Sequence, residues 1–280
     1  MVLEKNGGVA LAHPLQGEEV VITGMSGRFP KSDDIYQYRS NIYNKVDMVT
    51  SENRRWLPTN PEIPHRMGQI NLLEKMDAGQ FGLHYHEPNQ MDPMIRISLE
   101  KAYEVILDAG YNVDEMSGMR CGVFIGCCFS ESDAMVVMAT NSSPNFGVTG
   151  GCRSMIAQRI SHYFNLRGPS YTMDTACSSS MYAFEHGYRA IRSGLCDSAL
   201  IGGVNLCLNP ITSLQFARLG VLSADGTCKP FDENANGYAR SETVSFVFLQ
   251  KTKDARRIYA QVTPTPLPPP SYYGSSSLLH

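Results

Sequence analysis

Short apolar runs alternate with amphipathic stretches along most of this chain. Runs rich in β-branched and other apolar residues predict strands. They lie at residues 20–23, 121–126, 170–174, 198–206 and 243–249, and Gly24 is expected to close the first of them. Residues 50–90 are polar and contain several prolines, which favours loops and short pieces of structure.

Apolar positions three and four residues apart predict helices between these strands. One begins after the acidic pair at 33–34, with an apolar face made of Ile35, Tyr38 and Ile42. A second is expected to begin at Pro93, with Asp92 as its N-cap, and to end at Gly110.

Two more helices complete the pattern. Residues 152–164 predict one, which a turn at 167–169 separates from the strand at 170–174. The other follows Cys177, ends at Gly194 and has an apolar face of Met181, Phe184, Tyr188 and Ile191. Strands that alternate with helices of this length indicate an α/β layered fold.

Composition narrows the class of protein. The 280 residues are 42% hydrophobic, which is enough for a sizeable core, and the formal net charge of −3 gives no global bias toward nucleic acid or an anionic membrane. No apolar run approaches the roughly 20 residues of a membrane span. We expect a flexible leader at 1–17, one folded region at 18–262 and a disordered Pro/Ser-rich tail at 263–280.

The eight cysteines form no CxxC pair, so no zinc site is predicted, and several lie inside apolar runs. We interpret most of them as reduced, buried thiols of a cytoplasmic protein. Cys177 differs from the others because it follows a predicted strand directly and begins a helix. The N-terminus of a helix favours the thiolate, and its N–H groups can hold an oxyanion. Local chemistry leaves two interpretations open, a nucleophile and a buried structural cysteine.

The sequence around Cys177 resembles the nucleophile motif of β-ketoacyl synthases, with GPS at 168–170 and DTACSSS at 174–180. Five further segments resemble that family in the same order. They are VITGMSGRFP at 21–30, MDP at 91–93 with a helix to DAG at 108–110, GGVN at 202–205, LSADGTCKPFD at 222–232 and NGYARSE at 236–242. VDMVT at 46–50 and RRW at 54–56 are most similar to animal type I fatty acid synthases, arthropod ones among them, although polyketide synthases share the main motifs.

The resemblance implies a thiolase-like layered fold of which this chain holds mainly the N-terminal half. It implies that Cys177 accepts an acyl chain as a thioester, for decarboxylative condensation with a malonyl group in fatty acid biosynthesis. Phosphopantetheine on an acyl carrier protein domain would deliver both groups, and no cofactor or metal would bind directly. It also implies a homodimer that pairs through the strand at 170–174, a cytoplasmic location, and no nucleic-acid or membrane partner.

The family's condensation chemistry also uses two histidine motifs and a lysine, and those motifs do not occur in these 280 residues. His186 would face away from Cys177, because nine residues of helix turn through about 180°. His84 and His86 could share one face of a strand as a metal pair, but no third ligand is evident. The alternative hypothesis is therefore a truncated, catalytically inactive fragment or interaction form. For Glu242, in the last of the motifs above, we expect a structural role.

Overall fold

The computed structural model describes residues 16–57, 59–132 and 147–263. Nearly all of the expected leader at 1–17 and tail at 263–280 lies outside the described residues, and the proposed division of the chain stays a prediction. None of the helices within the described ranges is both long and apolar enough to cross a bilayer.

Six strands form the main sheet, in the order β5-β4-β6-β7-β1-β8. Their bounds are β1 Val20–Arg28, β4 Cys121–Gly126, β5 Ser170–Met173, β6 Ser198–Asn205, β7 Thr243–Lys251 and β8 Ala260–Gln261. Strand β4 pairs in parallel with both β5 and β6, whereas β7 is antiparallel to β6 and to β1. Strand β5 therefore lies at an edge, with β4 as its partner in the sheet.

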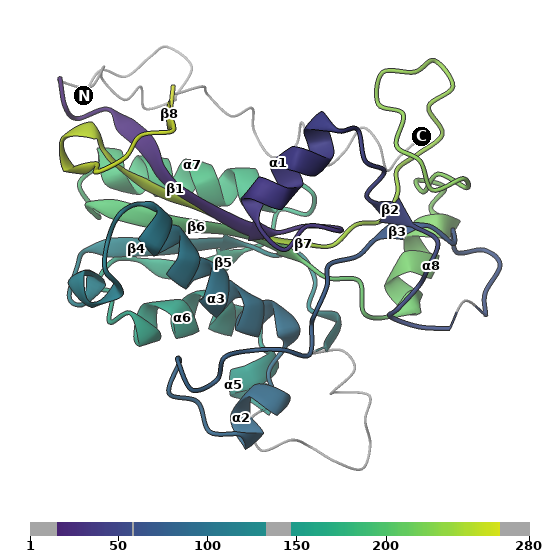
Figure 1. Cartoon of the computed structure of the whole chain (residues 1–280), viewed down its shortest axis with the longest axis horizontal. Coiled ribbons are helices and arrows are strands. Elements are labelled where there is room, and N and C mark those ends of the chain that lie inside the picture. The colour runs from purple at the N-terminus through teal and green to yellow at the C-terminus, as the bar shows by residue number, and fades with distance from the viewer. Residues whose placement is uncertain (1–15, 58, 133–146, 264–280) are drawn as a thin grey trace.

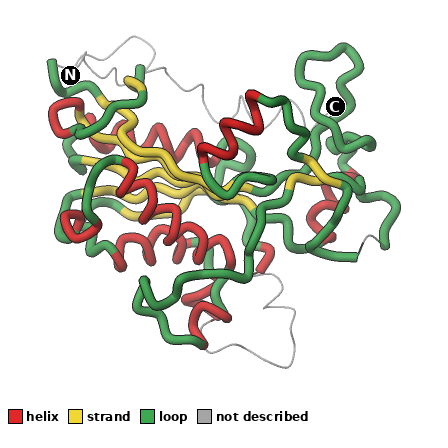
Figure 2. The backbone as a smooth tube through the Cα atoms, viewed as in Figure 1, coloured by secondary structure: helices red, strands yellow, loops and turns green. Residues whose placement is uncertain are grey.

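Helices cover both faces of this sheet, which confirms the expected α/β layers (Figure 1). They are α1 Ile35–Tyr43, α2 His86–Asn89, α3 Pro93–Asp108, α5 Gly147–Gly151, α6 Ser154–Tyr163, α7 Ser179–Arg192 and α8 Pro210–Arg218. Helices α3 and α6 lie on one face and α7 on the other, while β2 (Val49–Thr50), β3 (Met67–Gly68) and α8 lie beyond one end of the sheet. Figure 2 shows the strands as one continuous band between helices, with many loops gathered at that same end.

Strand β4 is an interior strand of the sheet, and its side chains are apolar on both faces. Val123 and Ile125 belong to the larger hydrophobic core beneath α3 and α6, and Phe124 belongs to the second core beneath α7. Successive strand residues point to opposite faces, so one uninterrupted apolar run supplies both cores. All three side chains are fully buried.

The sequence patterns predicted the ends of most helices and strands correctly. The Asp92 side chain accepts a hydrogen bond from Met94 N at 2.7 Å and caps α3, while Asp34 caps α1 in the same way. Gly110 and Gly194 have positive φ angles just after α3 and α7, as predicted. The helix α8 was not predicted, although Asn209 and Pro210 supply the usual signals for a helix start.

The prediction that Gly24 closes the first strand is wrong. Strand β1 continues to Arg28, and a Cβ atom at position 24 would lie 2.4 Å from Val105 O of α3. Gly24 therefore allows α3 to approach the middle of β1 closely.

The predicted apolar face of α7 is only partly right. Tyr188 and Ile191 are buried, but Met181 is 57% exposed. The face that meets the sheet instead uses small residues, including Ser179, Ala183 and Gly187. A Cβ atom on Gly126 of β4 would lie 2.4 Å from Ser180 N, so the start of α7 rests almost on the backbone of that strand. Hydrophobic spacing alone does not reveal such close contact.

Glu242 has the structural role expected for it. Its side chain is fully buried, and its two carboxylate oxygens accept hydrogen bonds from Arg55 Nε at 2.8 Å and Nη2 at 2.7 Å. The backbone N–H groups of Ile70 and Cys207 donate to the same carboxylate. The buried charge is thus fully hydrogen-bonded and links the loop around Arg55 to the start of β7.

Candidate active site around Cys177

Cys177 lies on the tight turn between β5 and α7. The strand ends at Met173 and the helix begins at Ser179, so five residues reverse the course of the chain. The Cys177 side chain is exposed, in contrast to the buried thiols of Cys121, Cys127, Cys196 and Cys207. Of the two interpretations that local chemistry left open, the buried structural cysteine is wrong.

Hydrogen bonds within the turn hold its shape. Ala176 N donates to Asp174 Oδ1 at 2.9 Å, and Ser179 Oγ donates to Ala176 O at 2.6 Å. Ser179 Oγ also accepts a hydrogen bond from Thr175 N at 2.9 Å. The Ser178 hydroxyl donates to Thr175 O at 2.8 Å. The short polar residues of the motif are therefore the ones that close this turn.

Ala176 has a left-handed backbone conformation, with φ of +52°. For a residue with a Cβ atom this costs about 1–2 kcal/mol relative to ordinary conformations. The surrounding hydrogen bonds compensate for that cost. This strained residue directly precedes the exposed thiol of Cys177.

The expectation that the first N–H groups of the helix are free for an oxyanion needs correction. Ser178 N donates to Thr175 O at 3.3 Å, and Ser179 N donates to Ala176 O at 3.1 Å. Both groups are thus used by the turn. Within the described part of the chain, no hydrogen bond engages the backbone N–H of Cys177 itself.

Asp174 anchors the turn to the neighbouring helix. Its Oδ2 atom accepts a hydrogen bond from Arg153 Nη1 at 2.9 Å, and the two side chains are each 42% exposed. Partial burial opposes ionisation of Asp174, but the hydrogen bonds from Ala176 N–H and Arg153 outweigh it and lower the pKa of the carboxyl. Asp174 is therefore a charged anchor at neutral pH, not a proton donor.

Cys128 is a second thiol at the same end of the sheet as Cys177, because it follows the end of β4 that lies beside the end of β5. It follows β4 and is only partly buried, and burial followed by the charge of Asp174 raises the pKa of its thiol to about 11. The carbonyl oxygen of Cys128 accepts a hydrogen bond from Arg153 Nη1, the same atom that donates to Asp174 Oδ2, so Cys128 lies beside the turn that carries Cys177.

An aromatic cluster borders the site on the side of α8. Phe216 makes edge contacts with Phe129 at 6.2 Å and with Tyr238 at 6.4 Å between ring centroids, and the Arg240 guanidinium lies 4.8 Å from the Phe216 ring. Burial raises the pKa of the Tyr238 phenol and outweighs the opposing effect of the Arg240 guanidinium.

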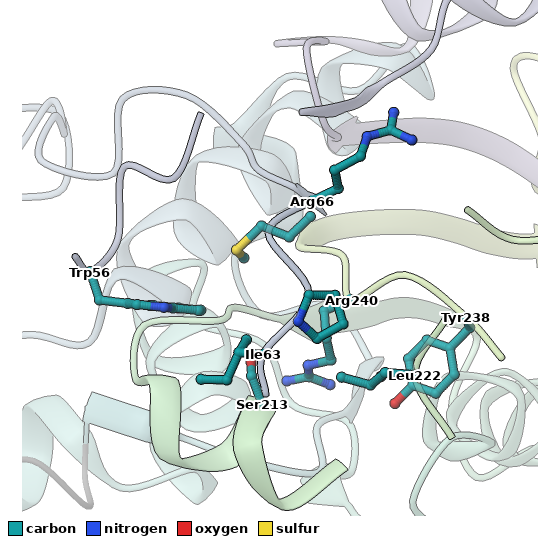
Figure 3. A pocket seen from close by; sticks show the side chains of 9 residues that line it. Trp56, Ile63, Arg66, Ser213, Leu222, Tyr238 and Arg240 are labelled. Carbon is teal, nitrogen blue, oxygen red and sulfur yellow. The ribbon is translucent and has the colours of Figure 1, made fainter. Parts of the chain in front are cut away.

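A small pocket opens beside Tyr238 and Arg240 (Figure 3). Trp56 and Ile63 line its other side, and the buried Ser213 hydroxyl points into the same space. The cavity itself encloses only about 10 Å³. That is about the space one water molecule needs, so this pocket does not hold an acyl chain.

Comparison with known proteins now gives the family. The model of the beta-ketoacyl synthase N-terminal domain matches residues 17–255. This chain belongs to the beta-ketoacyl synthase family. The resemblance seen in the sequence motifs is confirmed, and so is the thiolase-like fold class that it implied.

The relatives include fatty acid and polyketide synthases. A fatty acid synthase of the goose Anser anser anser is 44% identical over 245 residues, 88% of this chain and 70% of that sequence. A highly reducing polyketide synthase of Cryptosporiopsis is 40% identical over 183 residues, 65% of this chain and 8% of its own length. The ketosynthase domain of an oxazolomycin synthase from Streptomyces albus superposes with a TM-score of 0.79 at 32% identity, covering 87% of this chain. This chain spans 44% of that domain.

Among the residues that the structure describes, no histidine makes a hydrogen bond with Cys177. His186 Nδ1 is 3.3 Å from the hydroxyl of Tyr171 on β5, as part of an exposed pair. The strand expected for His84 and His86 is wrong, because His86 begins the short helix α2. His162 lies in α6 as predicted, and His65 is exposed in a loop. His13 and His280 lie outside the described residues. Within the described ranges, no group of three His, Cys, Asp or Glu side chains could hold a metal ion.

The sequence motif predicted Cys177 as a site residue, whereas Cys128 and Arg153, which lie beside its turn, were not predicted. The signal for Cys128 was present, since the doublet 127–128 directly follows a predicted strand. Its meaning depends on strand order, because only the parallel pairing of β4 with β5 brings the ends of these two strands together. Arg153 reaches the site from a position next to α6, which no local pattern reveals.

Proposed function

We propose that Cys177 is the nucleophile that accepts an acyl chain in a β-ketoacyl synthase reaction. The observation that carries the proposal is the exposed thiol on a strained, hydrogen-bonded turn at the start of α7. Sulfur attack on an acyl thioester forms a tetrahedral oxyanion. Collapse of that intermediate expels the carrier thiolate and leaves the acyl group on Cys177. The backbone N–H of Cys177 is available to donate to the oxyanion.

The partner that fits this chemistry is an acyl carrier protein domain with a phosphopantetheine arm. The relatives of this chain, which are fatty acid and polyketide synthases, favour it. The thioester exchange needs no other cofactor. Condensation would follow when a decarboxylated malonyl group attacks the acyl-cysteine carbonyl, which forms a carbon–carbon bond and returns the Cys177 thiolate. The product would be a 3-oxoacyl thioester.

The oligomeric state and the cellular location belong to the same proposal. Homodimers would pair through β5, which is supported by its position at the edge of the sheet and by the 39% exposure of Tyr171. The site of action would be the cytoplasm, where reduced thiols persist.

The experiment uses the 280-residue chain with an acyl-pantetheine thioester, alone and then with a malonyl thioester. We expect a stable acyl adduct on the protein but no 3-oxoacyl product, because no histidine in the described residues accompanies Cys177. Adduct formation is followed by intact mass and condensation by chromatography of the thioesters. The acylation part of the proposal fails if no adduct forms. The expectation for condensation fails if the 280 residues make a 3-oxoacyl thioester unaided.

A further inference from the structure

The two adjacent strand ends at the active site each carry a thiol. In the parallel pair β4–β5, Gly126 is opposite Met173, and Cys127 N continues the ladder with a hydrogen bond to Met173 O at 3.0 Å. Neighbouring strands lie about 4.8 Å apart. Cys128 is therefore beside the turn that leads to Cys177.

Arg153 holds these two segments together. Its Nη1 atom donates to the carbonyl oxygen of Cys128 and also to Asp174 Oδ2, the latter at 2.9 Å. Asp174 in turn fixes the turn through Ala176 N. One guanidinium group thus fixes the backbone of Cys128 relative to the backbone that carries Cys177.

The other nearby cysteines are less suitable partners for Cys177. The side chains of Cys121 and Cys127 are fully buried in the core under α3 and α6. Cys152 and Cys128 are both partly buried, and the Cys152 sulfur lies 3.3 Å from Ser154 Oγ. Cys128 is instead held by Arg153 beside Asp174, three residues before Cys177.

We propose that Cys128 and Cys177 form a reversible disulfide bond when the protein meets a peroxide. The Cys177 thiolate attacks one peroxide oxygen and becomes a sulfenic acid, with the other oxygen leaving as water after protonation. The Cys128 sulfur then attacks the Cys177 sulfur. The sulfenic hydroxyl leaves as a second water, taking the thiol proton of Cys128. Two thiols are oxidised, one peroxide is reduced, and a dithiol reductant reverses the bond.

This bond would remove the acyl-accepting thiol and protect it from irreversible oxidation to the sulfinic acid. That consequence rests on the proposed function of Cys177. The bond itself does not, because mass spectrometry detects it whether or not the chain accepts acyl groups. A failed acylation and a failed cross-link are therefore separate results.

The test treats the 280-residue chain with hydrogen peroxide, alkylates the remaining thiols and maps peptides by tandem mass spectrometry. We expect a Cys128–Cys177 cross-linked peptide, a loss of about 2 Da and two fewer alkylated thiols, all reversed by dithiothreitol. The same treatment with diamide, an azo-type thiol oxidant, should give the same peptide. The proposal is overturned if neither oxidant produces it, or if Cys177 pairs with another cysteine instead.

A matched pair of variants tests the protective role. In Cys128→Ser, peroxide should carry Cys177 to the sulfinic acid, and dithiothreitol should restore less than about a tenth of its alkylation. In Cys228→Ser, which removes an exposed thiol elsewhere, recovery should equal that of the unchanged chain. Circular dichroism checks that each variant is folded. Equal recovery in both variants would contradict the role given to Cys128, and the cross-link map of the unchanged chain does not depend on either variant.

Discussion

Arg153 Nη1 and Asp174 Oδ2 lie 2.9 Å apart, in a hydrogen-bonded ion pair that connects the end of β5 to the residue preceding α6. Asp174 also accepts from Ala176 N, so this carboxylate holds the strained residue beside the nucleophile. The geometry of the Cys177 turn thus depends on a side chain outside the turn, and several predictions about the site depend on this contact.

Asp174→Ala should lower the free energy of unfolding by about 1 kcal/mol, which is typical for loss of a side-chain acceptor that caps backbone N–H groups. It should also slow acylation of Cys177 several-fold, because the turn loses its anchor. Asp174→Asn keeps the acceptor for Ala176 N and should cost less. Urea denaturation and the rate of thioester labelling measure the two effects.

Asp197→Ala is the matched control. Asp197 pairs with Arg120 at 3.4 Å, and both side chains are 55% exposed, away from the turn. This variant should change stability by less than about 0.5 kcal/mol and leave the labelling rate unchanged. Equal labelling rates in Asp174→Ala and Asp197→Ala would show that the anchor has no influence on Cys177.

Ala176→Val should destabilise the protein by about 1–2 kcal/mol more than Ala176→Gly does. The reason is the positive φ at this position, which glycine adopts easily and a β-branched residue resists. Thermal or urea unfolding of the two variants provides the comparison. If valine and glycine were equally stable at position 176, the left-handed conformation of this residue would be incorrect.

Glu242→Gln should be the most destabilising of these changes. It leaves Arg55, only 10% exposed, without its carboxylate, and breaking a buried pair from one side costs about 3–5 kcal/mol. Glu62→Gln is the matched control, because Glu62 accepts two hydrogen bonds from Arg218 in a similar geometry but on the surface. The control should lose less than about 1 kcal/mol in the same denaturation experiment. Similar losses in both variants would contradict the structural role of Glu242.

Alkaline pH should weaken the fold through its buried thiols. Burial raises the pKa of Cys121, Cys127 and Cys207 to about 12, whereas the pKa of an unfolded thiol is about 8.5. Between these values the unfolded state loses protons that the folded state keeps. Each thiol therefore lowers the unfolding free energy as pH rises, by at most roughly 1.4 kcal/mol per pH unit. Their stabilising contribution is complete below about pH 8.5.

Urea midpoints at about pH 8 and about pH 10 measure this effect. Because tyrosines and lysines also titrate at high pH, the comparison between variants is decisive. Cys121→Ala should reduce the loss of stability between the two pH values, whereas Cys228→Ala, at an exposed position, should leave it unchanged. A loss that is identical in the two variants would mean that the buried thiol does not titrate as described.

The elements that sequence patterns predicted are those whose signals are local. Asp92 and Pro93 mark the start of α3, and the uninterrupted apolar run of β4 marks a strand buried on both faces. The errors concern contacts between distant segments. Gly24 was interpreted as the end of a strand, because no local pattern shows that Val105 of α3 packs against it. Met181 was placed in the core, because helical spacing does not reveal which side of the helix faces the sheet.

The same distinction between local signals and contacts of distant segments applies to the candidate active site. The motif at 174–180 identified Cys177, since its residues form the turn among themselves. Cys128 and Arg153 reach it through the strand order and through α6, which a single sequence does not specify. The N–H donors were also misjudged, because the two carbonyl groups that occupy Ser178 N and Ser179 N belong to the tight turn itself.

The most direct test of the account is site-mapped acylation. The 280-residue chain is incubated with an acyl-pantetheine thioester, digested at low pH to preserve thioesters, and sequenced by tandem mass spectrometry. The acyl group should be found on Cys177, at more than about ten times the occupancy of the exposed Cys228, and Cys177→Ala should lose this adduct while Cys228→Ala retains it. An acyl group spread evenly over both cysteines, or equal labelling of Cys177→Ala and the unchanged chain, would contradict the assignment of Cys177 as the nucleophile.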